Sequence, residues 1–439
     1  MPSNVALTGL AKELEARAES GKPIRIGLIG SGEMGTDIVT RASLMSGINV
    51  AAIADVRVEN ATKAVEIAFG GDGFSTIAHT TDGLNAAIEA GKVGVVNDAN
   101  LLLESGLVDI VVEATGLPGV GAEFGLKAME RGKHLVMMNV EADITIGSYL
   151  KSKAEELGVV YSLGAGDEPS SCMELIEFVT AMGHKVVCAG KGKNNPLNID
   201  ATPDAYRAEA DERNMNSRML VEFVDGSKTM VEMAAIANAT GLIPDIAGMH
   251  GPAVGPKDLA STLIPKKDGG VLNDIGRVDF SVGKGVAPGV FVIVEAQHPR
   301  IWERLKDLKM GEGPYFSFLR PYHLTSLEVP LTCAKAVLHG KGDMVPLDKP
   351  VAEVCARAKK DLSVGEQLDQ IGEYCYRAWI MDAVEARTIG GIPCGLLAGS
   401  VVTKTIRKGA LITYENTTLP ADSKIVKLRA LQDQMIFGG

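Results

Sequence analysis

The most specific chemical signal in the sequence is a glycine-rich turn directly after an apolar run. Residues 24–35 read Ile-Arg-Ile-Gly-Leu-Ile-Gly-Ser-Gly-Glu-Met-Gly, which contains a G-x-G-x-x-G pattern. The first glycine of such a pattern permits a sharp turn, the second lets a pyrophosphate approach the backbone, and the third allows close helix packing. The turn therefore predicts a dinucleotide site. Its expected cofactor-binding residues are Gly30, Gly32, Glu33, Met34 and Gly35.

An acidic residue stands where a nicotinamide dinucleotide would place its adenosine ribose. Asp55 lies 20 residues after Gly35, at the end of the next apolar run. A carboxylate there hydrogen-bonds the ribose 2′-hydroxyl of NAD, whereas an arginine accommodates the 2′-phosphate of NADP. Arg57 follows two residues later. Asp55 thus favours NAD, while Arg57 keeps NADP open.

Two later loops are expected on the nicotinamide side of the same sheet. Thr115 and Gly116 follow the apolar run Ile110–Ala114, and Asn139 follows His134–Met138. The carboxyl ends of parallel strands meet at one edge, where such folds bind their ligands. We therefore expect Thr115, Gly116 and Asn139 to contact the cofactor, although Thr115 and Gly116 would equally suit an ordinary glycine-rich loop.

A second cluster of polar residues lies further along the chain. Lys191 and Lys193 stand two residues apart in Gly190–Asn198, so in an extended segment both ammonium groups point the same way. With the amide of Asn195, they would suit a phosphorylated or carboxylated substrate, or a developing alkoxide. The alternative is a pair of solvated loop lysines.

Acids and a histidine supply candidates for proton transfer. Glu168, in a loop after a predicted strand, could act as acid or base, or ligate a divalent cation. Asp167 could equally cap the predicted helix from Ser171 to Ala181. Arg320 could hold an anion and His323 could move a proton, although a lone loop histidine is more often structural.

The elements that would position these residues follow from the apolar pattern. Short apolar runs alternate with helical stretches, which predicts a doubly wound parallel sheet, with Gly70–Asn97 as an inserted loop and helix. After residue 165 we expect a mostly antiparallel α+β substrate and dimerisation domain, followed by a β-rich module and a tail helix, Ser423–Met435. The strands expected are Ile24–Ile29, Val50–Ala54, Ile110–Ala114, His134–Met138 and Val159–Leu163, then Lys185–Ala189, Arg218–Phe223, Lys228–Met233, Arg277–Val282 and Val290–Ala296.

Length and composition frame this organisation. The chain has 439 residues, which predicts several domains, with boundaries expected at 1–165, 166–348 and 349–439. A net charge of −11 disfavours nucleic acid and anionic membranes as partners. Six scattered cysteines, without a C-x-x-C pair, are typical of reduced thiols, and a cytoplasmic location is expected.

Several strings resemble a known family. The sequences at 30–35, 139–143, 164–172, 190–196 and 320–326 are similar to those of the 1-deoxy-D-xylulose 5-phosphate reductoisomerase-like family, within the homoserine-dehydrogenase-like oxidoreductases. The C-terminal module resembles a SAF domain of the β-clip type. Asp55 before Arg57 departs from the NADPH-type pocket of the reductoisomerases.

The resemblance implies isomerisation of a keto-sugar phosphate followed by hydride transfer from NADPH or NADH, in isoprenoid precursor synthesis. It implies Lys191 and Lys193 for a substrate oxyanion, Glu168 for acid–base work, and Arg320 with His323 for the phosphate. Conventional members use a divalent cation, Mg²⁺ or Mn²⁺, whose ligands here stay unknown. A homodimer or homotetramer is expected.

Two alternatives remain open. One is an NAD-dependent dehydrogenase of a hydroxy-acid or sugar-acid, without rearrangement, which Asp55 favours. The other is a nucleotide-sensing protein that binds carbohydrate through its SAF-like module.

Overall fold

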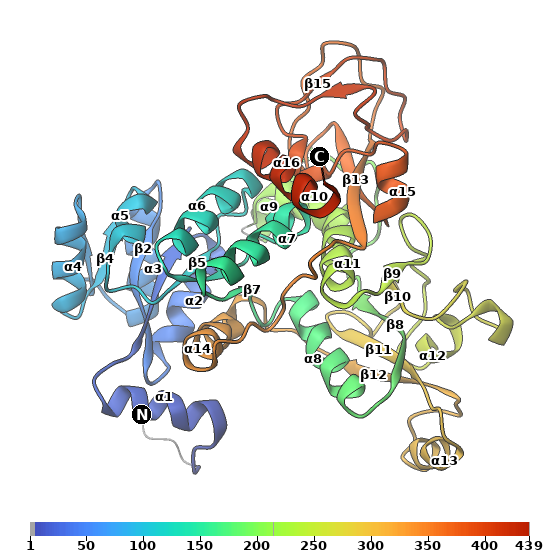
Figure 1. Ribbon diagram of the computed structural model, residues 1–439, viewed down its shortest axis with the longest axis horizontal. Helices are drawn as coiled ribbons and strands as arrows, with labels where there is room; N and C mark the ends of the chain where they lie inside the picture. Colours follow the sequence, from blue (N-terminus) through green and yellow to red (C-terminus); the bar gives the residue numbers. More distant parts are fainter. Residues whose placement is uncertain (1–4, 214, 439) are drawn as a thin grey trace. The chain divides into compact units, whose positions relative to one another are not determined.

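The computed structural model describes residues 5–213 and 215–438, and Figure 1 shows its elements in chain order. The chain divides into two compact units. Unit 1 holds residues up to 143, 149–167 and 324–345, and unit 2 holds 144–148, 168–323 and 346 onward. The predicted three-domain boundaries stay a prediction. The first four residues of the predicted N-terminal domain lie outside the described part of the chain.

Unit 1 is built on a seven-stranded parallel sheet in the order β3-β4-β2-β1-β5-β6-β7. Strands β2, β4 and β3 lie on one side of β1, and β5, β6 and β7 lie on the other. The predicted doubly wound sheet is therefore confirmed. Apolar side chains such as Ile26, Leu28 and Val112 form its buried core. The strands are β1 (Ile24–Ile29), β2 (Ile48–Ala54), β3 (Ser75–Ile77), β4 (Val93–Val96), β5 (Ile110–Glu113), β6 (His134–Met137) and β7 (Tyr161–Leu163).

The expectation of an inserted loop and helix at Gly70–Asn97 is wrong. This segment supplies strands β3 and β4 of the main sheet, joined by helix α4 (Thr81–Glu89). The apolar run of β4 is only four residues long and contains Gly94, which packs against Leu84 of α4. A run this short gives too little pattern to be recognised as a central strand.

The helices of unit 1 connect its strands and begin and end at recognisable residues. Thr80 caps α4 by accepting a hydrogen bond from Gly83 N–H, and Gly70 ends α3 in the left-handed conformation. Helix α7 begins at Val140, directly after its cap Asn139, and Ile146 interrupts its helical backbone. These helices are α1 (Gly9–Glu19), α2 (Glu33–Ser43), α3 (Val58–Phe69), α4, α5 (Ala99–Glu104), α6 (Pro118–Glu130), α7 (Val140–Leu157, which spans both units) and α14 (Val329–His339), with the short η2 (Thr325–Glu328).

Unit 2 carries a five-stranded sheet in the order β12-β11-β8-β10-β9. The central strand β8 is parallel to β10 and antiparallel to β11. The sheet is therefore mixed, and the expectation of a mostly antiparallel sheet is wrong. Its strands are β8 (Lys185–Gly192), β9 (Ile243–Pro244), β10 (Arg277–Ser281), β11 (Val290–Glu295) and β12 (Tyr315–Arg320).

Two predicted strands of unit 2 are helices. Arg218–Phe223 lies in α10 (Ser217–Val224), and Lys228–Met233 lies in α11 (Ser227–Thr240). Almost every residue of α11 is buried, so its sequence lacks the polar face that marks a surface helix. Between residues 168 and 323, the other helices of unit 2 are α8 (Glu168–Ala181), α9 (Arg207–Glu212), α12 (Leu259–Thr262) and α13 (Pro299–Asp307), with the short η1 (Lys266–Asp268).

The segment predicted as the C-terminal module is rich in short strands and turns over residues 349–438, as expected. Its main feature is the antiparallel pair β13 and β14, and its tail helix α16 confirms the helix expected near 423–435. The six cysteines are buried and free. None of the helices in the described part of the chain combines the length and apolar character needed to cross a bilayer. The module contains β13 (Ala352–Ala358), β14 (Tyr376–Asp382), α15 (Ala383–Thr388), η3 (Cys394–Leu396), β15 (Val401–Val402), β16 (Thr417–Thr418) and α16 (Lys424–Phe437).

Candidate active site

The glycine-rich turn of unit 1 has the geometry of a phosphate-binding loop. Gly30 has φ +94°, and a Cβ there would lie 2.8 Å from the Ala114 carbonyl oxygen. A Cβ on Gly35 would lie 2.4 Å from the Gly30 carbonyl oxygen, so these two positions require glycine. A Cβ on Gly32 would meet nothing within 4 Å, so the backbone is open where a pyrophosphate would approach. Glu33 and Met34 form the first turn of α2.

Asp55 braces this turn. Its Oδ2 atom accepts hydrogen bonds from the Ser31 N–H at 2.9 Å and the Ser31 hydroxyl at 2.7 Å. Among the described residues, one donor reaches its Oδ1 atom, the Arg57 N–H at 2.9 Å, so this oxygen keeps capacity for a ribose hydroxyl. Arg57 is exposed and precedes α3. Both residues that bear on the choice of cofactor thus stand beside the turn.

Thr115 and Asn139 converge on Glu113, a residue that the sequence analysis did not single out. Glu113 ends β5, is fully buried, and accepts hydrogen bonds from the Thr115 N–H at 3.0 Å and the Thr115 hydroxyl. Burial raises the pKa of Glu113 to about 7, although the hydrogen bonds from Thr115 and the nearby amide of Asn139 oppose the rise. Asn139 also caps α7 through Ala142 N–H, at 3.2 Å. Gly116 follows with φ +67°.

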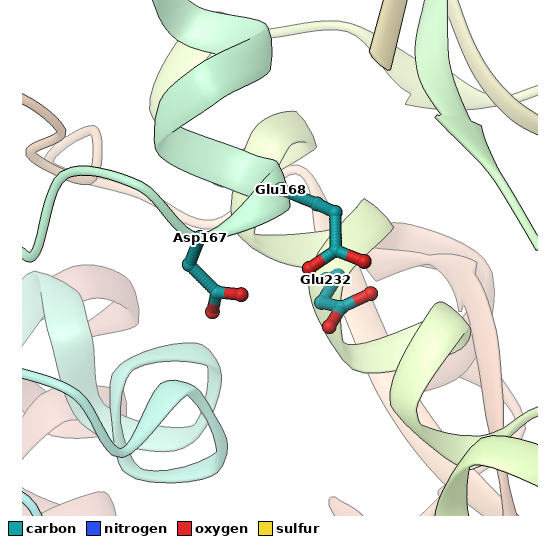
Figure 2. A group of neighbouring side chains, drawn as sticks. All are labelled: Asp167, Glu168 and Glu232. Atoms are coloured by element: carbon teal, nitrogen blue, oxygen red, sulfur yellow. The ribbon is translucent and has the colours of Figure 1, made fainter. Parts of the chain in front are cut away.

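In unit 2, Lys191 is held between two carboxylates. Its Nζ atom lies 2.7 Å from Glu168 Oε1 and also pairs with Glu232 Oε2. Glu168 begins helix α8, and Glu232 lies on the buried helix α11, as Figure 2 shows together with Asp167, which directly precedes Glu168. Burial alone would lower the pKa of Lys191, but the two carboxylates outweigh it and raise that pKa above its usual range. Lys191 is therefore a fixed cation.

Lys193 directly follows the same strand, β8, and is also buried. Within the described part of the chain, its hydrogen-bond partners are backbone carbonyls and not carboxylates. Its Nζ atom donates to the backbone carbonyls of Asn195 at 2.6 Å and Phe223 at 2.8 Å. Burial, and then the charge of Lys191, lowers the pKa of Lys193 to about 8, although Asp225 and Glu232 act in the opposite direction. Both lysines are about 95% buried, so the alternative of solvated loop lysines is wrong.

His323 faces the other oxygen of Glu168. Its Nε2 atom lies 3.5 Å from Glu168 Oε2, and its Nδ1 atom lies 2.6 Å from the Pro288 carbonyl oxygen. A carbonyl oxygen only accepts, so Nδ1 carries a hydrogen and Nε2 is the atom that gains or loses a proton. His323 and Glu168 are thus arranged for proton exchange.

Arg320 stands at the end of β12, and its guanidinium pairs with Glu174 Oε2 at 2.7 Å and stacks on the Tyr322 ring. Asn195 contributes its backbone carbonyl to Lys193. The structure therefore brings together Lys191, Lys193, Glu168, His323 and the Asn195 carbonyl, whereas the Arg320 charge is directed to Glu174.

Glu232 is the residue of this group that sequence reasoning missed. It stands in Met230-Val-Glu-Met-Ala-Ala-Ile236, a lone acid in an apolar run. A buried carboxylate needs a partner, and a lone acid in such a run signals one. The run was predicted as a strand, and this prediction gave Glu232 no buried position that would require a partner.

The acidic pair does not fit a divalent cation as it stands. The nearest carboxylate oxygens of Glu168 and Glu232 lie within 4.8 Å of each other, a spacing that a metal ion could bridge. Lys191 donates to both carboxylates, so its positive charge takes the place that a cation would need.

Comparisons with known proteins match a cofactor-binding domain and a catalytic domain to two different parts of the chain. Residues 26–163 match the NAD-binding domain of homoserine dehydrogenase, and residues 166–329 match the catalytic domain of oxidoreductase DRL. Both parts of an oxidoreductase are present. The first match covers the glycine turn, Asp55, Glu113 and Asn139, and the second covers Lys191 and its partners.

A homoserine dehydrogenase from Methylobacillus glycogenes is 30% identical over 118 residues, 27% of this chain. The chain spans only a quarter of that enzyme's length (25%). Among solved structures, a probable dehydrogenase from Thermotoga maritima is 15% identical, with a TM-score of 0.43, 74% of this chain and 91% of that chain covered. A scyllo-inositol dehydrogenase from Lactobacillus casei, bound to NAD(H) and scyllo-inositol, is 16% identical, with a TM-score of 0.37 and coverage of 62% and 74%.

Proposed function

We propose that the protein transfers a hydride between a nicotinamide cofactor and a hydroxyl-bearing carbon of a small phosphorylated or carboxylated sugar-like substrate. One observation carries this proposal: Lys191 and Lys193 are buried two residues apart, Lys191 between two carboxylates and Lys193 against two backbone carbonyls. These surroundings move their pKa values in opposite directions, Lys191 upward and Lys193 down to about 8. Environments that separate the pKa values of neighbouring groups are the mark of divided acid–base roles.

Lys191 supplies a permanent positive charge in this proposal. Two of its three N–H donors go to Glu168 and Glu232, which leaves one for a substrate oxygen. An ammonium held in a water-poor site stabilises a developing alkoxide far more than it would in bulk water.

Lys193 gives or takes the proton. When its amine is neutral, its two N–H bonds point to the Asn195 and Phe223 carbonyls, so its lone pair points in the remaining direction. In oxidation, the hydroxyl proton passes to this lone pair while the hydride leaves the same carbon. In reduction, Lys193 returns the proton to the oxygen. The bound nicotinamide accepts or supplies the hydride.

The residues of unit 1 would hold the cofactor. Gly32 would lie against the pyrophosphate and Asp55 would accept a ribose hydroxyl, which favours NAD, while Arg57 leaves NADP as the second choice. Thr115 and Asn139, fixed by Glu113, would stand at the nicotinamide side.

The first substrate to test is 1-deoxy-D-xylulose 5-phosphate. Its conversion needs a proton taken from a hydroxyl, cleavage and reformation of a C–C bond, and hydride addition to the resulting aldehyde. The Glu168–His323 pair would take the first proton and Lys191 would hold the oxyanion. We expect oxidation of NADPH or NADH, without loss on chelation of divalent cations, because Lys191 replaces a metal.

The test uses full-length protein whose cofactor binding has been measured directly. Lys193→Met should lower turnover on the order of 10²–10⁴-fold with cofactor affinity retained, because it removes the group that carries the proton. Turnover that survives this change would overturn the assigned proton carrier. Failure with 1-deoxy-D-xylulose 5-phosphate would reject the reductoisomerase, and hydroxy-acids and sugar-acid phosphates with NAD would then test the simple dehydrogenase, which Asp55 favours.

A further inference from the structure

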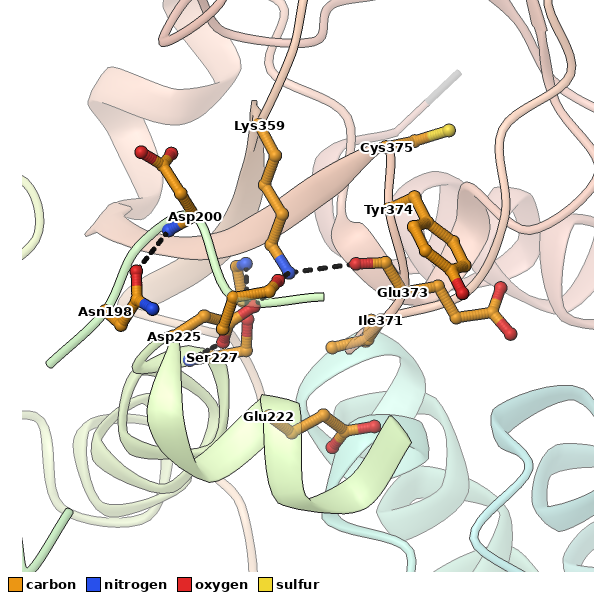
Figure 3. Close-up of polar contacts among 12 residues, drawn as sticks. Asn198, Asp200, Glu222, Asp225, Ser227, Lys359, Ile371, Glu373, Tyr374 and Cys375 are labelled. Atoms are coloured by element: carbon orange, nitrogen blue, oxygen red, sulfur yellow. Dashed lines mark hydrogen bonds and ion pairs between the residues drawn. The ribbon is translucent and has the colours of Figure 1, made fainter. Parts of the chain in front are cut away.

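A buried lysine of the C-terminal module reaches the interior of unit 2. Lys359 directly follows β13, and its Nζ atom lies 2.6 Å from Asp225 Oδ2, as Figure 3 shows. The same atom donates to the carbonyls of Ala201 at 2.9 Å and Glu373 at 3.0 Å. Two donors of this ammonium go to carbonyls, and its third contact is the ion pair with Asp225. Because desolvation offsets much of the attraction in a buried ion pair, such a pair is better explained by the geometry it fixes than by stability.

Asp225 forms the corner between two helices. It follows α10, and the next residue, Gly226, has φ +85°. Its Oδ1 atom accepts the Ser227 N–H at 2.8 Å, at the start of α11. The Ser227 hydroxyl in turn accepts the Ala378 N–H of β14, at 2.9 Å. The C-terminal module therefore holds this corner at two points, through Lys359 and through β14.

The helix turn that leads into this corner contacts Lys193. The Phe223 carbonyl, two residues before Asp225, accepts a hydrogen bond from Lys193 Nζ at 2.8 Å. This carbonyl belongs to the last turn of α10, where carbonyls lack helical partners and attract a cation. Three charges act on the Lys193 ammonium: Lys191 lowers its pKa, whereas Asp225 and Glu232 raise it.

We propose that Lys359 is a positioning residue for Lys193: by fixing Asp225, it sets both the carbonyl and the carboxylate charge that face the Lys193 ammonium. Lys359 itself touches no reacting atom. This inference rests on the proposed function for its effect on turnover, but its effect on the titration of Lys193 can be measured without any substrate.

The experiment compares three full-length variants, Lys359→Met, Lys359→Arg and Lys360→Met. Without Lys359, buried Asp225 has lost its cation and takes up a proton, so it no longer raises the pKa of Lys193. We expect Lys359→Met to lower the Lys193 titration midpoint by about one pH unit or more and kcat by on the order of 10- to 100-fold. Lys359→Arg should restore most of both. Lys360, half exposed and paired with Glu366, is the matched control and should change neither.

An unchanged Lys193 midpoint in folded Lys359→Met would overturn the proposal. If that variant does not fold, the double change Lys359→Met with Asp225→Asn removes both charges and should still lower the midpoint; no shift in the double variant would also overturn it. A shifted midpoint in a protein that turns over no tested substrate would support the positioning role and reject the proposed function.

Discussion

Carboxylates are buried near the ends of two strands, β5 and β8, and the two places differ in the charge of the groups around the carboxylates. At the end of β5, Glu113 accepts hydrogen bonds from Thr115 and lies beside the neutral amide of Asn139, and burial raises its pKa to about 7. Beside the end of β8, Glu168 and Glu232 face the ammonium of Lys191, and the pKa of that lysine is raised. Burial alone makes a carboxyl keep its proton, whereas burial beside a cation fixes a pair of charges.

The largest effect is expected where the cation is removed. Lys191→Met would remove the ammonium that pairs with both buried carboxylates, which costs about 3–5 kcal/mol of unfolding free energy. Replacing a lysine in a solvated loop would change the free energy of unfolding by no more than roughly ±0.5 kcal/mol. Chemical denaturation measures the difference. Adding Glu232→Gln should recover part of the loss, and a neutral effect of Lys191→Met would contradict the buried pairing.

The second prediction concerns Glu113, whose partners carry no charge. The folded protein keeps the Glu113 proton up to about pH 7, whereas the unfolded chain loses it near the ordinary value of 4.5. Stability is therefore lost as pH rises through this window, by on the order of 3 kcal/mol. Glu113→Gln should gain that amount relative to the natural protein between about pH 4 and pH 8. Glu89→Gln, at an exposed position, is the control, and a flat difference for Glu113→Gln would contradict the raised pKa.

Asp55 provides a smaller test at the cofactor end. Asp55→Ala removes an acceptor that only the 2′-hydroxyl needs, while a 2′-phosphate is repelled by it. We expect NAD affinity to fall about tenfold more than NADP affinity, because a hydrogen bond to a charged group contributes about 1.5–3 kcal/mol. Titration calorimetry with each cofactor measures the ratio. An equal loss would mean that Asp55 serves only to brace Ser31.

The smallest effect is expected at Arg320, whose ion pair with Glu174 lies at the surface. The Glu174 side chain is 48% exposed, so solvent screens the pair. Glu174→Gln should change the unfolding free energy by less than about 1 kcal/mol. A loss as large as that of Lys191→Met would show that exposure does not separate the two kinds of pair.

The sequence predicted features that depend on neighbouring residues better than features that depend on residues far apart in the chain. The glycine turn, Asp55 and the parallel sheet follow from local patterns and are confirmed as structural features. Lys191 and Lys193 could be singled out by their spacing. Glu232, which pairs with Lys191, and Asp225, whose charge acts on Lys193, lie far along the chain, on or directly after helices that the apolar pattern misidentified as strands. Pairing across such distances is set by tertiary packing, which no local pattern contains.

The most direct test of the divided roles is the titration of the two lysines in the full-length protein. Selective ¹³C labelling of lysine, with assignment through Lys191→Arg and Lys193→Arg, would follow the carbon beside each Nζ by NMR as pH rises. Lys193 should lose its proton at about pH 8, whereas Lys191 should stay protonated beyond the ordinary lysine value of 10.5. Two lysines that both titrate near that ordinary value would contradict the account.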